Sequence, residues 1–251
     1  FLKGTLMKTT VQLLLLLFGI SLFFSCSDGT QLLLSNENEK IEAILNFDIN
    51  KINEDSKNDN NIFDHFGREH NLGLYNLMSS NILTRSGNEN LFEKAIETYQ
   101  LSDLKRLEIT ETITMENYNN DFRNSPLLNK VNSDILKTEM ISFLKYFREV
   151  NVEGGFSTLE DVNAAILLYE SNATTKFENS FDLQTYLEFT STFRHSANYW
   201  YNYEISTPTT RAWKWWKFVI VAAADAIGAT GGVATAISAS AASITLVDKA
   251  L

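Results

Sequence analysis

Cysteine, proline and basic residues are all scarce in this sequence, and each shortage excludes something. The 251 residues include one cysteine, Cys26, so no disulfide bond can form within the chain. The only prolines are Pro126 and Pro208, which leaves long stretches without a helix breaker. Basic residues number 21 against 31 acidic ones. This balance argues against a nucleic-acid partner, because nucleic acids are bound largely by lysine and arginine on phosphates.

Motifs of common catalytic chemistries are missing too. Gly228, Gly231 and Gly232 precede no Lys-Ser or Lys-Thr pair and follow no predicted strand, so they do not form a phosphate-binding loop. The G-x-S-x-G pattern of serine hydrolases is absent. No acid and base, and no nucleophile and base, stand at a spacing that indicates catalysis. The sequence therefore does not favour an enzyme, and it indicates no cofactor.

The start of the chain has the pattern of an export signal. Lys8 supplies a positive charge, and 11–24 is an almost unbroken apolar run of the length found in secretory signals. It is shorter than the roughly 20 apolar residues that span a bilayer. The run ends in Leu22-Phe23-Phe24-Ser25-Cys26, so a small residue precedes the single cysteine.

This ending resembles the signal of bacterial lipoproteins, and its phenylalanines are similar to those of Bacteroidota. Phe23 departs from the strictest pattern, in which a smaller aliphatic residue is usual. The resemblance implies that Cys26 is lipidated and becomes the mature N-terminus. The protein would then be held in the cell envelope, with the outer membrane as the expected site and its face open. Ordinary secretion and an uncleaved anchor are the alternatives.

Composition divides the chain into four regions. Residues 1–25 are upstream residues plus the signal, with Met7 as the expected start, and 26–38 form a short polar tether. An acidic body covers 39–206, and a Gly/Ala-rich hydrophobic tail led by Trp and Lys covers 207–251. Before Arg211 the mature chain carries 15 basic and 29 acidic residues, whereas the segment from Arg211 carries 4 and 2.

Apolar residues in the body recur at spacings of three and four, which predicts helices throughout. The sequence therefore predicts an all-α protein, an irregular helical bundle ending in a Gly/Ala-rich helix or helical hairpin. The segment 51–61, rich in Asn, Asp and Lys, is expected to be a loop. The expected helices cover 39–50, 62–81 and 102–119, with others starting at Asn90 (capping box with Glu93), Ser133, Ser157 (capping box with Glu160) and Ser180.

One cluster in the body, made of Asp64, His65, Glu69 and His70, suggests metal binding. His65 and Glu69 are four residues apart and share a helix face, but His70 points about 140° away from His65. The order H-x-x-x-E-H differs from both H-x-x-x-H and H-x-x-E-H, the patterns of zinc proteases. The sequence therefore assigns no metal site, and His65, Glu69 and His70 are kept only as candidates for a metal-dependent hydrolase.

His70 also lies on the apolar stripe of its expected helix. Gly67 is one turn before it, and a glycine within a helix costs about 1 kcal/mol, which suggests that another segment packs closely there. Gly67, His70, Asn71 and Leu74 resemble a G-x-x-H-N-x-x-L pattern in uncharacterised, mainly Bacteroidota, proteins. His195 stands among aromatic residues that either bind a ligand or form helix core.

Different features of the tail favour different structures. Trp213, Trp215 and Trp216 alternate with lysines, as at a membrane interface, and 219–247 contains one charge, Asp225. Small residues at every fourth position, including Gly228 and Gly232, would make a groove for close helix packing. A hairpin packed on the body or on itself, a membrane-inserting segment and a flexible tail all fit.

Two further observations concern Asp225 and the residues around it. The sequence pattern Ala-Asp-Ala-x-Gly-Ala at 224–229 resembles the tails of the same uncharacterised proteins, and also Gly/Ala-rich helices of bacteriocins. Burying one polar group alone costs about 1–3 kcal/mol, so Asp225 is expected to meet His70 or Asn71.

The expected function is that of a lipid-anchored envelope protein and binding or interaction module. Through its small-residue C-terminal helices the protein would pack closely with itself, by self-association, with a protein partner or with the membrane, and Cys26 would hold it at the membrane. The alternative is a membrane-active, toxin-like protein whose tail inserts, and the second alternative is the metal-dependent hydrolase.

Overall fold

A computed structural model describes residues 47–83, 90–113, 122–152, 156–206 and 215–249. The chain divides into two units, 1–46 and 47–251, and the first lies outside the described residues together with Cys26 and the tether. Regular structure in the described ranges is entirely helical, with no strand. The prediction of an all-α protein is confirmed.

The first described helix, α3 (Ile49–Asp55), lies partly where a loop was expected. Asp48 caps it by accepting a hydrogen bond from the backbone N–H of Lys51 at 3.1 Å. Ile49 and Ile52 are buried while the polar residues between them are exposed. The loop prediction was wrong for 51–55 because the high Asn, Asp and Lys content concealed this apolar pair. The expected helix residues 39–46 lie outside the described ranges.

Three helices follow, and their starts are close to the predicted ones. After a turn, α4 (His65–Leu83) begins three residues later than expected. Asn90 caps α5 (Leu91–Thr98), but Glu93 pairs with Arg106 and not with the cap. Ser102 caps α6 (Asp103–Thr112), which ends earlier than expected.

Two 3₁₀ turns, η1 (Phe122–Asn124) and η2 (Leu128–Lys130), lead to three long helices. These are α8 (Asp134–Val152), α9 (Leu159–Lys176) and α10 (Ser180–Ser206). The capping box of α9 is Thr158 with Asp161, one residue beyond the predicted pair of Ser157 and Glu160. Both pairs match the pattern, and the Asp161 carboxylate also accepts the backbone N–H of Ser157 at 3.1 Å.

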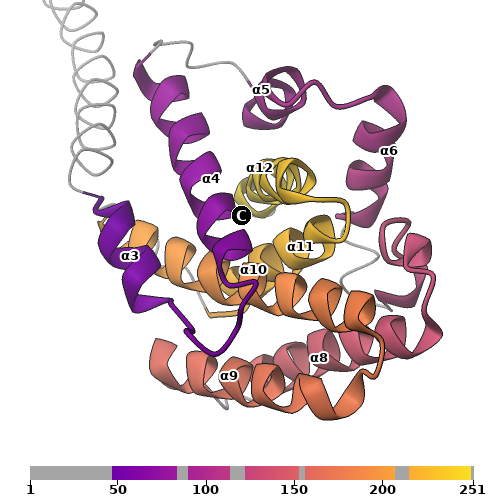
Figure 1. Ribbon diagram of the computed structural model, residues 1–251. Coiled ribbons are helices and arrows are strands. Elements are labelled where there is room, and N and C mark those ends of the chain that lie inside the picture. The colour runs from indigo at the N-terminus through magenta and orange to yellow at the C-terminus, as the bar shows by residue number, and fades with distance from the viewer. Residues whose placement is uncertain (1–46, 84–89, 114–121, 153–155, 207–214, 250–251) are drawn as a thin grey trace, which may run out of the picture. The chain divides into compact units, whose positions relative to one another are not determined.

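The tail forms a helical hairpin, which is one of the alternatives that the sequence left open. Helices α11 (Trp215–Ala229) and α12 (Val233–Lys249) are joined by a tight turn at 230–232. Figure 1 shows α12 with α4, α5, α6 and α11 around it, in agreement with its contacts to each of them. Among the described helices, none is both long and apolar enough to cross a membrane.

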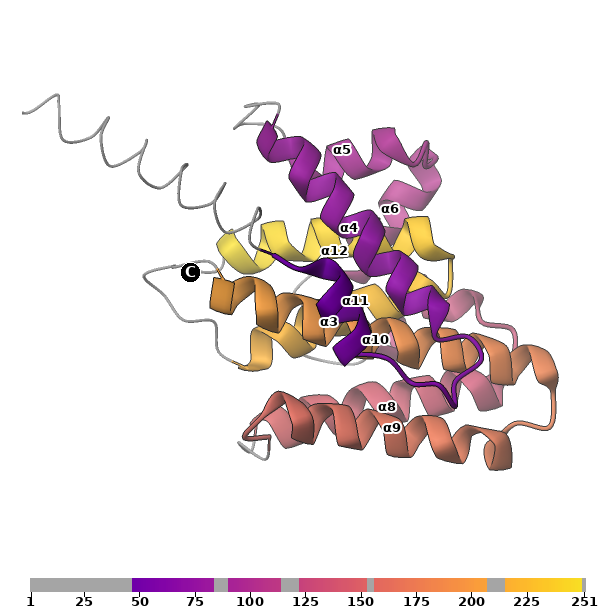
Figure 2. The ribbon, with the colours of Figure 1, turned by 60° about the vertical axis from the view of Figure 1, so that its left-hand side comes forward.

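The helices of 47–251 stack in successive layers. Figure 2 shows α8 and α9 together, then α10 with α11, then α12 with α4, and finally α5 and α6. The ring centroid of Phe143 on α8 lies 5.1 Å from that of Tyr169 on α9, within the first layer, and 5.0 Å from that of Phe193 on α10, which joins the first layer to the second. Small residues pack α11 against α12. Residues along both helices are buried, so the hairpin lies inside the fold.

The predicted groove of small residues is only partly correct. A Cβ on Gly228 would lie 2.7 Å from Cα of Ala236, so the hairpin helices touch closely at this glycine. Gly232 lies in the turn with φ +98°, and a Cβ there would meet nothing within 4 Å. The chain turns at Gly232, so the small residues before and after it, such as Gly228 and Ala236, do not share one continuous helix face.

Candidate functional site

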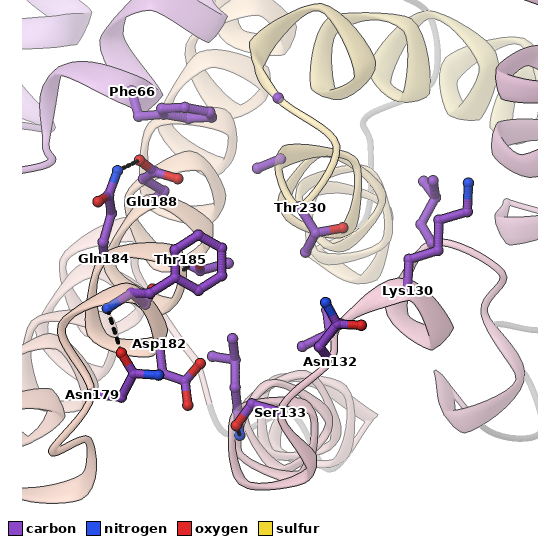
Figure 3. A pocket seen from close by; sticks show the side chains of 16 residues that line it. Phe66, Lys130, Asn132, Ser133, Asn179, Asp182, Gln184, Thr185, Glu188 and Thr230 are labelled. Atoms are coloured by element: carbon purple, nitrogen blue, oxygen red, sulfur yellow. Dashed lines mark hydrogen bonds between the residues drawn. The ribbon is translucent and has the colours of Figure 1, made fainter.

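Two of the surface pockets formed by the described residues are lined by candidate polar residues. The larger, about 530 Å³, lies between the start of α10, the η2–α8 junction and the α11–α12 turn (Figure 3). The smaller, about 390 Å³, lies along α3 and the start of α4. It is lined mainly by polar residues, and Asp64 in its wall is the outer end of a buried polar network.

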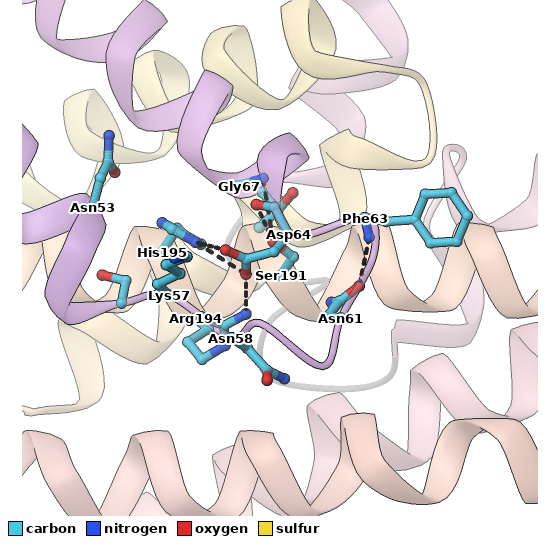
Figure 4. Close-up of polar contacts among 12 residues, drawn as sticks. Asn53, Lys57, Asn58, Asn61, Phe63, Asp64, Gly67, Ser191, Arg194 and His195 are labelled. Atoms are coloured by element: carbon cyan, nitrogen blue, oxygen red, sulfur yellow. Dashed lines mark hydrogen bonds and ion pairs between the residues drawn. The ribbon is translucent and has the colours of Figure 1, made fainter.

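Asp64, just before α4, faces two neighbours on α10. Nε2 of His195 lies 3.3 Å from each carboxylate oxygen of Asp64, and the Arg194 guanidinium bonds to the same carboxylate. Figure 4 shows the carboxylate between the imidazole and the guanidinium. The Ser191 hydroxyl donates to the backbone carbonyl of Asp64 at 3.0 Å. These four residues are called the Asp64 centre below.

The Asp64 centre holds separated charges. Burial alone would raise the pKa of Asp64, but hydrogen bonding to His195 and the charge of Arg194 lower it to about 2. Burial lowers the pKa of His195, and this outweighs the opposing effect of the carboxylate. At neutral pH we therefore infer an ionised Asp64 beside a charged Arg194 and a neutral His195.

Arg194 connects the Asp64 centre to α9. Its guanidinium donates to Glu170 at 3.2 Å, and the Glu170 side chain is only 2% exposed. The side-chain amides of Asn58 and Asn61 donate to the same carboxylate. One buried cation thus neutralises carboxylates from two segments, and removing it would leave both without their counter-ion.

A second histidine–aspartate pair lies where α4 meets the hairpin. Nε2 of His70 is 3.5 Å from Oδ2 of Asp225 on α11, and both side chains are fully buried. The hydroxyls of Ser196 and Ser240 donate to the same oxygen at 2.5 and 2.9 Å. The structure thus brings together His70 and Asp225, which the sequence named, and Asp225 is held by three helices.

Asn71 links the two pairs and fixes the tautomer of His70. Its amide nitrogen donates to Asn53 Oδ1 and to the backbone carbonyl of His195, both at 3.0 Å. Its Oδ1 therefore faces Nδ1 of His70, 3.2 Å away, as an acceptor. Nδ1 then carries the proton, and the Nε2 lone pair of His70 points to Asp225. The bridge also means that Asn71 contacts His70 and not Asp225.

The His70–Asp225 pair is neutral at pH 7. Burial lowers the pKa of His70 to about 4 and raises that of Asp225 to about 8, although its hydroxyl partners oppose the second shift. A protonated Asp225 can donate to the free Nε2 of His70. The pair thus holds one titratable proton, on Asp225, between about pH 4 and 8.

Comparison of the chain with protein-family models, curated proteins and solved structures finds no match. The function is therefore argued from the chain's own residues.

The metal candidates are not brought together. His65 and Glu69 are exposed, while His70 faces the hairpin. Within the described ranges, no group of three or more His, Cys, Asp or Glu side chains is placed to hold a metal ion.

The other predicted residues have mixed outcomes. Trp213 lies outside the described residues, and only the helical backbone is described for Trp215 and Trp216. A Cβ on Gly67 would lie 2.6 Å from His195 Cδ2, so the close packing predicted at this glycine is confirmed.

Sequence reasoning missed the Asp64 centre as a unit. Asp64 and His195 are 131 residues apart, and no local spacing connects them. The available signal was the Arg194–His195 pair on an apolar, aromatic helix, where both residues required buried partners. From the sequence, Asp64 is only a member of the metal cluster with His65, Glu69 and His70.

Proposed function

We propose that this chain is a lipid-anchored bacterial envelope protein whose helical body acts as a binding module. The observation that carries the proposal is the apolar run that ends at Cys26, the only cysteine in the chain. One acyl chain binds a membrane marginally and several hold it stably, so multiple acylation at Cys26 would keep the body beside the bilayer.

The position of the hairpin supports a binding module over the membrane-active alternative. Val221, Ala222 and Ala226 are fully buried, and Gly228 is closed against α12. These surfaces serve the packing of α11 and α12 against α4 and α10. A tail that inserts would have to break the Asp225 contacts as well. The partner surface is therefore sought elsewhere on the body.

Metabolic labelling tests the anchor. The full chain is expressed in a bacterium that processes lipoproteins, fed with an alkyne-labelled fatty acid, and compared with a Cys26→Ser variant. We expect labelling and membrane fractionation of the unchanged chain, and neither label nor membrane retention for the variant. An unmodified thiol in the intact mass of the unchanged protein would overturn the proposal.

Dye leakage tests the alternative. The purified full chain is added to liposomes of anionic and zwitterionic lipid loaded with a self-quenched dye. The proposal expects no leakage above that of the Asp225→Asn variant or of buffer. Rapid leakage by the unchanged protein would favour the membrane-active function.

A further inference from the structure

The larger pocket brings together three parts of the chain that are far apart in sequence. Its walls come from the first turns of α10, from the η2–α8 junction and from the turn of the hairpin. Figure 3 shows Asp182, Ser133 and Thr230 around the same space, each from a different segment. A volume of about 530 Å³ is within the range of small-molecule pockets.

Asp182 is the residue that the fold leaves unexplained. It is 9% exposed, it lines the pocket, and its carboxylate makes no hydrogen bond or ion pair with the described residues. A first-turn position on α10 favours an acidic residue, but an exposed carboxylate would serve that purpose equally well. The side chain is largely enclosed but its oxygens reach the pocket, and a carboxylate that is enclosed in this way with no cation beside it attracts a positively charged ligand.

The other walls restrict the type of cation. Glu188 lies two turns further along α10 and adds a second carboxylate, of which one oxygen accepts the Gln184 amide at 2.8 Å. Lys130 is the one cationic residue among the lining residues, and it already pairs with Glu108. Glu188 is six residues from Asp182, which places them about 9 Å apart along the helix axis. This separation is too large for both carboxylates to bind one metal ion, and it favours an organic cation held by one of them.

Apolar side chains complete the pocket. Phe66 faces it from α4, and Leu136 and Val131 face it from the η2–α8 junction. Figure 3 shows Phe66 on the side of the pocket where Glu188 lies, with Asp182 on the other side. Apolar surface across the pocket from a carboxylate favours an ammonium group attached to an apolar body, since the apolar surface loses water on binding.

We propose that this pocket binds a small organic ammonium ion, with the ammonium on Asp182 and an apolar body against Phe66 and Leu136. This ligand class would be what the binding module of the proposed function recognises. The pocket proposal rests on the proposed function only for the claim that the helical body binds a ligand.

Calorimetric titration of the full chain in a non-ionic detergent tests the proposal. The probes are 2-phenylethylammonium, its neutral analogue 2-phenylethanol and its anionic analogue 3-phenylpropanoate. We expect the ammonium to bind at least roughly tenfold more tightly than either analogue, because charge-assisted hydrogen bonds are the strong ones. This comparison uses the unchanged protein and does not depend on how a variant folds.

Two variants then locate the site. Asp182→Asn should reduce ammonium affinity roughly tenfold or more. Asp103→Asn removes an exposed first-turn carboxylate from α6 and should leave the affinity unchanged. Equal thermal midpoints for the two variants would show that both remain folded. Equal binding of all three probes, no binding of the ammonium at millimolar concentration, or an unchanged affinity in Asp182→Asn would each overturn the proposal.

The two proposals fail separately. Fatty-acid labelling at Cys26 does not depend on the pocket, and calorimetry on the purified chain does not depend on the anchor. If the chain is labelled but binds no ammonium, the lipid anchor stands and the ligand class is wrong. If the chain is unlabelled but binds the ammonium, the ligand class stands and the envelope location is wrong.

Discussion

Two histidine–aspartate pairs among the described residues differ in charge state. In the Asp64 centre the carboxylate is 15% exposed, bonded to Arg194, and its pKa is about 2. In the other pair Asp225 is fully enclosed among hydroxyls and alanines, and its pKa is about 8. The same two residue types are thus ionised in one place and protonated in the other.

The difference shows what a buried carboxylate requires. A guanidinium and an opening to a polar pocket keep Asp64 charged, whereas the hydroxyls of Ser196 and Ser240 and the Trp200 side chain do not compensate Asp225 for the loss of water. The charged pair connects α4, α9 and α10 through strong contacts, and the neutral pair connects α4 to the hairpin through weaker ones. The following experiments would break or sharpen this contrast.

Removing one pair entirely should have the largest effect. A chain that ends at Thr210 lacks the hairpin but keeps the residues of the Asp64 centre. We expect it to lose cooperative thermal unfolding and its near-UV circular dichroism, because α4 and α10 lose the apolar surface of Val221 and Ile227. A truncated chain that retained a sharp transition would show that the Asp64 centre alone can hold the body together.

Breaking the charged pair should cost about 3–5 kcal/mol. Arg194→Leu leaves Glu170 and Asp64 without their buried cation. Removing one partner of a buried ion pair leaves an uncompensated charge and strongly lowers the free energy of unfolding. The matched control is Arg106→Leu, whose surface pair with Glu93 should contribute at most about 1 kcal/mol. Urea unfolding of both variants measures the difference. Equal losses would mean that Arg194 is not the counter-ion of the network.

The neutral pair should be visible as pH dependence. Asp225 ordinarily titrates near 3.8 and His70 near 6.5. Between pH 4 and 6.5 the folded pair holds one proton on Asp225 and the unfolded chain holds one on His70, so stability does not change. From pH 6.5 to 8 the unfolded chain has lost its proton while the folded pair keeps it. Stability should therefore fall by about 2 kcal/mol over this interval.

Asp225→Asn provides the comparison, because it keeps the shape and removes the titration. Above pH 4 its folded state holds no proton on this pair, whereas the unfolded chain protonates His70 below 6.5. The variant should lose about 3 kcal/mol as pH falls from 6.5 to 4 and show no loss from this pair between 6.5 and 8. The Asp64 centre contributes equally to both proteins and cancels in the difference. Parallel curves of unfolding free energy against pH would contradict the assignment.

The two pairs also differ in how far the sequence could predict them. His70 and Asp225 are polar residues on apolar faces, so the cost of burying each one alone predicted their meeting. Asp64 lies in a polar segment beside the metal candidate His65, and nothing local indicates a partner 131 residues away. Helix starts followed from capping residues such as Asn90 and Ser102, which act within one turn. Long-range polar pairing is set by how helices stack, which spacing along one helix does not encode.

The smallest expected effect comes from two glycines of α4. A Cβ on Gly67 would lie 2.6 Å from both the His195 ring and the Ser191 backbone carbonyl, whereas on Gly73 it would meet Cδ1 of Ile237 at 2.3 Å. Alanine gains about 1 kcal/mol of helix propensity at each site. The end of an isoleucine can rotate away but a backbone carbonyl cannot, so Gly73→Ala should remain close to wild type.

Gly67→Ala should be less stable than Gly73→Ala by about 1–3 kcal/mol, the usual cost of overpacking. The histidine NMR signals add a test of cause: the alanine would displace the His195 ring from Asp64, so the His195 resonances should move while those of His70 remain. A loss of stability in Gly67→Ala with both histidines unmoved would place the strain in the α4–α10 backbone contact. The charged pair would then be a consequence of how closely the helices approach and not its cause.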